Sequence, residues 1–235
     1  MLKAKKPVKV SQKEIREDNL VTAYTRFMGW YYKNERTVLI AGAALLLVII
    51  GSISWAFLKS SQEEEAADLL AKVYPMVATQ QWEKALNGDS TNASVGLAAI
   101  ADDFSGTSSG SIAAFYAGKA NMELGNYEQA FEYFDMVSSK SPHLEAAALG
   151  GMAAVYEHQK EPAKASDLYS KAAEKAGNPL LTPRYLYLAA LTAAEAGEYS
   201  NAIDFLTDLK ENYKDAAYTR DADKLLALYQ AKSLN

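Results

Sequence analysis

Two decapeptides in the second half of the chain share one residue frame, and this frame constrains the fold more than any other feature. Gly125–Phe134 (GNYEQAFEYF) and Gly197–Leu206 (GEYSNAIDFL) both read Gly, any residue, Tyr, two residues, Ala, a hydrophobe, an acid and two large hydrophobes. Lys160–Tyr169 (KEPAKASDLY) lies between them in the same frame, with Pro162 in place of the tyrosine. The unit recurs after 35 and then 37 residues, measured at the shared alanines Ala130, Ala165 and Ala202.

A period near 34 residues with two helices per unit is typical of tetratricopeptide repeats. Gly118 and Ala130 are small, as expected where the two helices of a unit cross closely. Tyr127 and Phe134 are large enough to fill the space between neighbouring helices. Each unit has one apolar face that only a neighbour covers. The sequence therefore predicts an all-α fold, a tetratricopeptide-like right-handed helical solenoid over residues 59–235.

This repeat domain is expected to hold about three full units, a divergent first helix pair near Trp82 and a capping helix over residues 216–233. The acids Glu63, Glu64 and Glu65 are interpreted as the first turn of its first helix. The run SGTSSGS, residues 105–111, predicts a turn between helices, because it lacks the Gly-Lys-Ser/Thr ending of a phosphate loop. No strand-forming alternation is present in the sequence.

An uncharged apolar run precedes this domain, from Val38 to Leu58. As a helix it would be about 31 Å long, and the hydrocarbon core of a bilayer is about 30 Å thick. The run predicts a single transmembrane helix over residues 38–58 that contacts the lipid bilayer. A cleaved signal peptide is the alternative, since Ser54 and Ala56 fit a cleavage pattern. The long leader and the length of the run favour an uncleaved anchor.

The charges are divided unequally about this run. Nine basic and four acidic residues precede Val38, whereas 15 basic and 25 acidic residues follow Leu58. The positive-inside rule therefore predicts that residues 1–37 are cytoplasmic and that the large domain lies on the other side of the membrane. Residues 1–13 are polar and basic, which predicts a disordered tail.

From Ile15 to Tyr32, apolar residues recur at helical intervals and end in three consecutive aromatic residues, Trp30–Tyr32. This pattern predicts an amphipathic helix. Two interpretations remain open from the sequence. The helix lies on the cytoplasmic face of the membrane, or it is a plain extension of the spanning helix.

Several function classes are disfavoured by composition. The acidic repeat domain lacks the basic surface that nucleic-acid binding needs. The chain has no Cys, which excludes disulfides and thiolate metal sites. His143 and His158 fall in different units without metal-ligand spacing, and Asp102-Asp103 has no acid partner. We therefore expect no enzyme activity, no catalytic or metal site, no cofactor and no small-molecule substrate.

In tetratricopeptide arrays the first helix of each unit lines the concave surface. The repeat frame predicts a protein-binding groove whose inward positions include small residues, Ala147, Gly150 and Ala154. The candidate contact residues are Ile112, Phe115, Lys119, Met122, Glu157, Arg184, Tyr187 and Leu191. Such a surface suits an amphipathic helix or an extended apolar segment. Ordinary packing against a neighbouring helix is the alternative for the aromatic members.

Three segments carry a resemblance to a known family: LNGD at 86–89, residues 102–135, and residues 181–206. With a single N-terminal span before acidic repeats, the chain resembles the YfgM-type ancillary subunit of the bacterial SecYEG translocon. It is also similar to tetratricopeptide membrane proteins of Bacteroidetes- and Chlorobi-like bacteria. The resemblance implies a location in the bacterial inner membrane with a periplasmic repeat domain.

The resemblance also implies binding partners: the translocon, periplasmic chaperones or exported chains. The leading hypothesis from the sequence is a membrane-anchored, chaperone-like adaptor that binds envelope proteins. The alternative is a structural scaffold subunit of a stable membrane protein complex.

Overall fold

The computed structural model describes residues 12–89 and 94–234 of the chain. The chain divides into two units, residues 1–57 and residues 58–235. The first unit contains α1 (Gln12–Lys33) and the N-terminal part of α2 (Glu35–Ala78), with Asn34 between the two helices. Most of the predicted basic tail, residues 1–11, lies outside the described residues. The helix that follows it begins at Gln12, earlier than the predicted Ile15.

Helix α2 is 44 residues long and passes through the position where a second helix was expected to begin. The predicted helix start at Glu63–Glu65 is therefore wrong. Nothing between Lys59 and Glu65 is a helix breaker, and glutamate and glutamine favour helix. An 18-residue stretch of α2 is long and apolar enough to be a candidate membrane span, and none of it is buried. A signal sequence would have the same composition.

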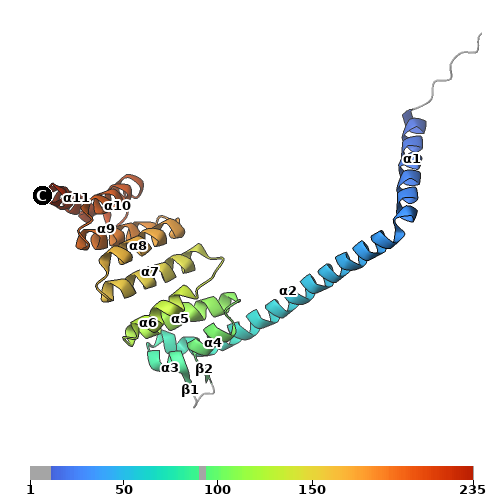
Figure 1. Cartoon of the computed structure of the whole chain (residues 1–235). Helices are drawn as coiled ribbons and strands as arrows, with labels where there is room; N and C mark the ends of the chain where they lie inside the picture. Colours follow the sequence, from blue (N-terminus) through green and yellow to red (C-terminus); the bar gives the residue numbers. More distant parts are fainter. Residues whose placement is uncertain (1–11, 90–93, 235) are drawn as a thin grey trace, which may run out of the picture. The chain divides into compact units, whose positions relative to one another are not determined.

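The second unit consists of helices that pack in chain order, as Figure 1 shows from α3 to α11. The divergent first part contains the end of α2, α3 (Trp82–Asn87) and α4 (Leu97–Asp103). Three helix pairs follow, and they correspond to the three predicted units. Their bounds are α5 (Ser108–Glu123), α6 (Tyr127–Asp135), α7 (Pro142–His158), α8 (Pro162–Ala176), α9 (Thr182–Glu195) and α10 (Tyr199–Asn212). The terminal helix is α11 (Thr219–Ser233). The all-α prediction is confirmed.

Several local predictions need correction. The chain does contain two short antiparallel strands, β1 (Gly88–Asp89) and β2 (Ser94–Val95). The turn predicted over residues 105–111 ends earlier, because Thr107 is the N-cap of α5 and its hydroxyl accepts a hydrogen bond from the Gly110 amide at 2.9 Å. The last helix begins at Thr219 rather than at residue 216.

The repeat frame corresponds to one packing motif. Ala130, Ala165 and Ala202 are each fully buried in the second helix of their unit. The residue one turn later, four positions on, is large and buried in every unit; these residues are Phe134, Tyr169 and Leu206. Side chains separated by four residues lie on the same face of a helix. The small and the large residue of the frame therefore form the inner face of α6, α8 and α10.

Phe134 shows why small residues are needed on the first helices. A Cβ at Gly118 of α5 would lie 2.7 Å from its ring, and a Cβ at Gly151 of α7 would lie 2.6 Å from it. The ring thus fills the space between α5 and α7 against two glycines. The prediction that Gly118 is small because helices cross closely there, and that Phe134 fills the space between helices, is confirmed.

Glu63 joins α2 to the start of α5. Its carboxylate accepts hydrogen bonds from the backbone amides of Ser108 and Ser109, at 2.6 and 2.9 Å, and from the Ser109 hydroxyl at 2.6 Å. These amides have no partner within α5, because the first turn of a helix leaves its donors unsatisfied. Partial burial raises the pKa of Glu63, but the hydrogen bonds from Ser109 and Ser108 outweigh this effect and lower the pKa below its usual value.

We predict that Gly118→Val lowers the free energy of unfolding by about 1–3 kcal/mol, because the added atoms overlap the Phe134 ring. Urea unfolding followed by circular dichroism measures this change. Gly106→Val is the matched control, since no atom lies within 4 Å of a Cβ built at Gly106. Equal stability of the two variants would contradict the packing described for Phe134.

We predict that Glu63→Gln destabilises the protein by about 1 kcal/mol near neutral pH, the usual effect of losing a helix cap. The folded-state pKa of Glu63 lies below its unfolded value of 4.5. The contribution of Glu63 to the free energy of unfolding is therefore complete above that unfolded value and is lost as the pH falls through the folded-state pKa. Unfolding curves at several pH values should show that the difference in the free energy of unfolding between Glu63→Gln and wild type becomes smaller in acid. Glu64→Gln, at an exposed neighbour, should have little effect at any pH.

Candidate protein-binding groove

A groove of about 460 Å³ runs across the first helices of the three units. Helix α5 forms one side through Phe115, Lys119, Met122 and Glu123, and α9 forms the other through Arg184, Tyr185 and Leu188. The floor belongs mainly to α7, whose lining residues are Ala147, Gly150, Gly151 and Ala154. Phe134 and Tyr169 also line the groove from the second helices α6 and α8. We call this feature the α5–α9 groove.

The groove is hollow because α7 carries almost no side-chain volume there. A Cβ at Gly150 would lie 2.7 Å from the Tyr185 ring, so α9 also packs close to bare backbone at this point. The Tyr185 and Tyr169 rings are stacked, with centroids 6.4 Å apart. The rings of Phe134 and Tyr185 therefore pack against the small residues of α7. Because these residues have little or no side chain, the surface of α7 is recessed between α5 and α9.

Two cations lie at the edges of the α5–α9 groove. The Lys119 ammonium is 5.3 Å from the centroid of the Trp82 ring, and the Arg184 guanidinium is 5.9 Å from that of Tyr185. Both side chains are exposed, and within residues 12–89 and 94–234 neither is ion-paired with a carboxylate. Each cation is held instead against an aromatic face. Both can bond to an acidic or carbonyl group of a bound chain.

Glu157 has a structural partner. The Tyr169 hydroxyl donates a hydrogen bond to its carboxylate, and Tyr169 is only 4% exposed. Burial, and then this hydrogen bond, raise the pKa of Tyr169 above its usual value. Glu157 itself lines a smaller hollow beside the α5–α9 groove, together with Ala154, His158, Lys160 and Glu195. It is therefore not a wall of the groove to which the sequence assigned it.

Some of the other candidate residues line the α5–α9 groove, and others lie outside it. Phe115, Lys119, Met122 and Arg184 lie together in the α5–α9 groove. Ile112 lines an adjoining apolar hollow of about 710 Å³, which shares Ala147 with the groove. Tyr187 stacks on Tyr218 at 5.2 Å and packs against the core beneath α11, as the packing alternative expected. Leu191 is partly buried and lies outside all three hollows.

Sequence reasoning missed several lining residues. Phe134 was expected only to fill the space between helices, yet it lines the groove, and Tyr169 lines it as well. Leu188 of α9 also lines it, as does Tyr185, which the repeat frame did not place inward. The small residues at positions 147, 150, 151 and 154 could have indicated these lining residues. A helix face with so little side-chain volume leaves the side chains that pack beside it, such as Phe134 and Tyr169, open to the groove.

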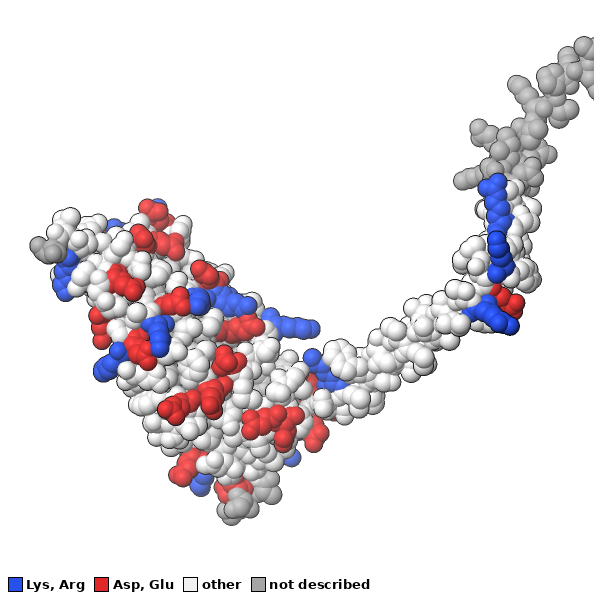
Figure 2. Space-filling view, in the orientation of Figure 1, with Lys and Arg blue, Asp and Glu red and all other residues white. Residues whose placement is uncertain are grey.

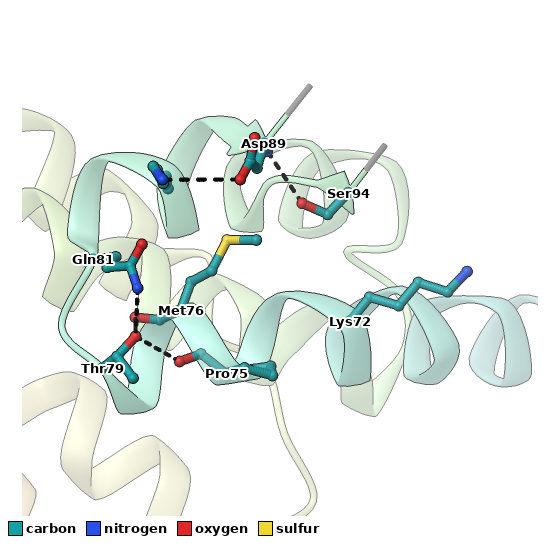
Figure 3. A pocket seen from close by; sticks show the side chains of 8 residues that line it. Lys72, Pro75, Met76, Thr79, Gln81, Asp89 and Ser94 are labelled. Atoms are coloured by element: carbon teal, nitrogen blue, oxygen red, sulfur yellow. Dashed lines mark hydrogen bonds and ion pairs between the residues drawn. The ribbon is translucent and has the colours of Figure 1, made fainter. Parts of the chain in front are cut away.

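A separate hollow of about 500 Å³ lies between the end of α2 and the strands β1 and β2 (Figure 3). Figure 3 shows Thr79 bonded both to Gln81 and to the Pro75 carbonyl, at 3.0 and 2.8 Å. The Asp89 amide donates to the Ser94 hydroxyl at 3.1 Å, and this bond joins the two strands. Most of these polar groups are already bonded within the protein, so we do not interpret the hollow as a binding site.

The two histidines contact different residues and do not meet. His143 is 3.1 Å from the Asn178 amide nitrogen, and His158 stacks on Tyr127 with ring centroids 4.6 Å apart. In the described part of the chain, no three His, Asp or Glu side chains gather in a way that would hold a metal ion.

The charges of the repeat domain are mostly negative, and Figure 2 shows acidic side chains spread over the helices that face the viewer. The acids are distributed over several helices and do not form one site. The α5–α9 groove combines apolar walls with two edge cations that have no carboxylate partner among the described residues.

Comparison with known families agrees with this architecture. A family model described as a tetratricopeptide repeat-like domain matches residues 28–182, and a tetratricopeptide repeat model matches residues 184–216. No curated protein is significantly similar to the chain. Tetratricopeptide repeat proteins are typically adaptors that bind other proteins. Since the first match covers more than half of the chain, this protein belongs to the tetratricopeptide repeat-like domain family.

Proposed function

We propose that this protein is a membrane-anchored adaptor that binds a segment of a partner protein in its α5–α9 groove. The observation that carries the proposal is the groove itself. It joins apolar walls from α5 and α9 to a floor of small residues and has the two cations Lys119 and Arg184 at its edges. Such a surface accepts an amphipathic helix or an extended apolar chain. Because helix packing forms the groove in advance, binding costs little ordering of the receptor.

The anchor is the apolar segment of α2, residues 38–58. Its length and composition suit a bilayer span. The family match begins at residue 28, so the matched region includes this segment. The excess of Lys and Arg before it favours a cytoplasmic N-terminus. We infer a bacterial inner-membrane protein whose repeat domain lies in the periplasm.

The partners we propose are envelope proteins near the translocon: the translocon itself, a periplasmic chaperone or newly exported chains. This finer assignment rests on the resemblance to the YfgM-type family. An adaptor held at the membrane raises the local concentration of its partner there without any new contact. A chaperone-like role follows if the groove holds exported chains transiently.

We predict that a photoreactive amino acid at Lys119 or Arg184 crosslinks to an envelope protein in intact cells, because both positions lie at the edge of the groove. The matched control is Lys171, an exposed position on α8 outside the groove. Mass spectrometry of the crosslinked bands identifies the partner.

Crosslinks that are equally strong from Lys171, or absent from both groove positions, would count against the groove as the binding site. A partner that also co-purifies stoichiometrically in mild detergent would favour the scaffold-subunit alternative over a transient adaptor.

We predict the membrane topology from the positions of two introduced cysteines, since the chain contains none. A membrane-impermeant maleimide added to spheroplasts should label Lys214→Cys, in the repeat domain, and should not label Thr22→Cys. Both cysteines should react once the membrane is lysed. Labelling of Thr22→Cys alone in sealed spheroplasts would place the repeat domain in the cytoplasm and overturn the proposed location.

A further inference from the structure

The second half of α1 has one aromatic side. Tyr24, Phe27 and Tyr31 recur at intervals of three and four residues, so they lie on the same face of the helix. Trp30 and Tyr32 flank that face. Tyr24 is 63% exposed, Phe27 58% and the flanking Trp30 55%, whereas Tyr31 is half-buried. A soluble helix rarely leaves so much aromatic surface uncovered.

The opposite side of the same turns is polar and cationic. Thr22, Arg26, Gly29 and Lys33 recur at intervals of four, three and four residues, which places them opposite the aromatic face. Between Val21 and Lys33 the sequence contains no acidic residue. This half of the helix therefore combines an aromatic face with an opposite face whose two charged residues, Arg26 and Lys33, are both cations.

Asn34 lies between α1 and α2 and separates the two helices. Its backbone amide donates hydrogen bonds to the carbonyl oxygens of Trp30 and Tyr31, both at 3.0 Å. Its side-chain amide donates a hydrogen bond to the Trp30 carbonyl oxygen at 2.9 Å. Asn34 thus satisfies carbonyls that a helix end would otherwise leave without partners. The two helix axes meet at an elbow there (Figure 1). The apolar run begins only four residues later, at Val38.

We propose that α1, from Val21 to Lys33, lies in the interface of an anionic lipid bilayer. Its aromatic face is buried at the level of the headgroups, and its cationic face is turned to phosphates and water. Trp and Tyr rings favour this depth because their apolar body and polar atoms suit both sides of the boundary. Arg26 and Lys33 complement anionic headgroups. This inference rests on the proposed function, because it takes the apolar segment of α2 as the span that brings α1 to the membrane.

The absence of cysteine allows a direct test. Single cysteines are introduced at each position from Val21 to Lys33 and at Leu46, within the apolar segment. The full chain is labelled with a nitroxide and reconstituted in vesicles of phosphatidylcholine and phosphatidylglycerol. Collision with oxygen, which concentrates in lipid, and with a water-soluble nickel chelate is measured by electron paramagnetic resonance.

The expected ratio of oxygen to nickel accessibility oscillates with a period of about 3.6 residues. Its maxima fall at positions 24, 27 and 31, its minima at 22, 26 and 29, and the label at Leu46 is fully in lipid. A uniformly high nickel accessibility along α1 with Leu46 in lipid would overturn this inference and leave the anchor intact. Nickel access at Leu46 would overturn the anchor itself.

Low accessibility to both reagents at 24, 27 and 31 would also overturn the inference, because it would show that protein, such as a second copy of the chain, covers the aromatic face.

Discussion

The repeat domain depends on large side chains of each second helix packing against small residues of the first helices. Phe134 is the clearest case, because its ring touches the backbone of α5 at Gly118 and of α7 at Gly151. Tyr169 and Leu206 occupy the same position in the next two units. Interiors are close-packed, so one added methyl group at these glycines must displace a ring.

The same requirement produces the α5–α9 groove. Small residues on α7 admit Phe134 from one side and Tyr185 from the other, and they leave the exposed face of α7 without side chains to fill it. The small residues of α7 therefore account both for the close packing of the helices and for the α5–α9 groove. The rings that hold the units together also line the hollow, and the cations at its edges are held by aromatic faces in place of carboxylates.

The start of the first full repeat unit is held by polar contacts. Glu63, deep within α2, supplies the acceptors for the first amides of α5. Interpreting Glu63–Glu65 as a helix start was reasonable from composition, because acids favour both a first turn and the N-terminus of another helix. Only the fold reveals that Glu63 caps a helix 45 residues later in the sequence.

The sequence alone determined the helical class, the three repeat units and the apolar run, because these depend on residue periodicity and on composition. It also predicted inward positions for Phe115, Lys119, Met122 and Arg184, since a repeat frame transfers positions from unit to unit, and these four residues line one hollow. The tertiary structure decided that Tyr187 is covered by Tyr218, that Glu157 is bound by Tyr169, and that Phe134 and Tyr169 line the groove. Those outcomes depend on which helix packs against which, and a periodic pattern within one helix does not contain that information.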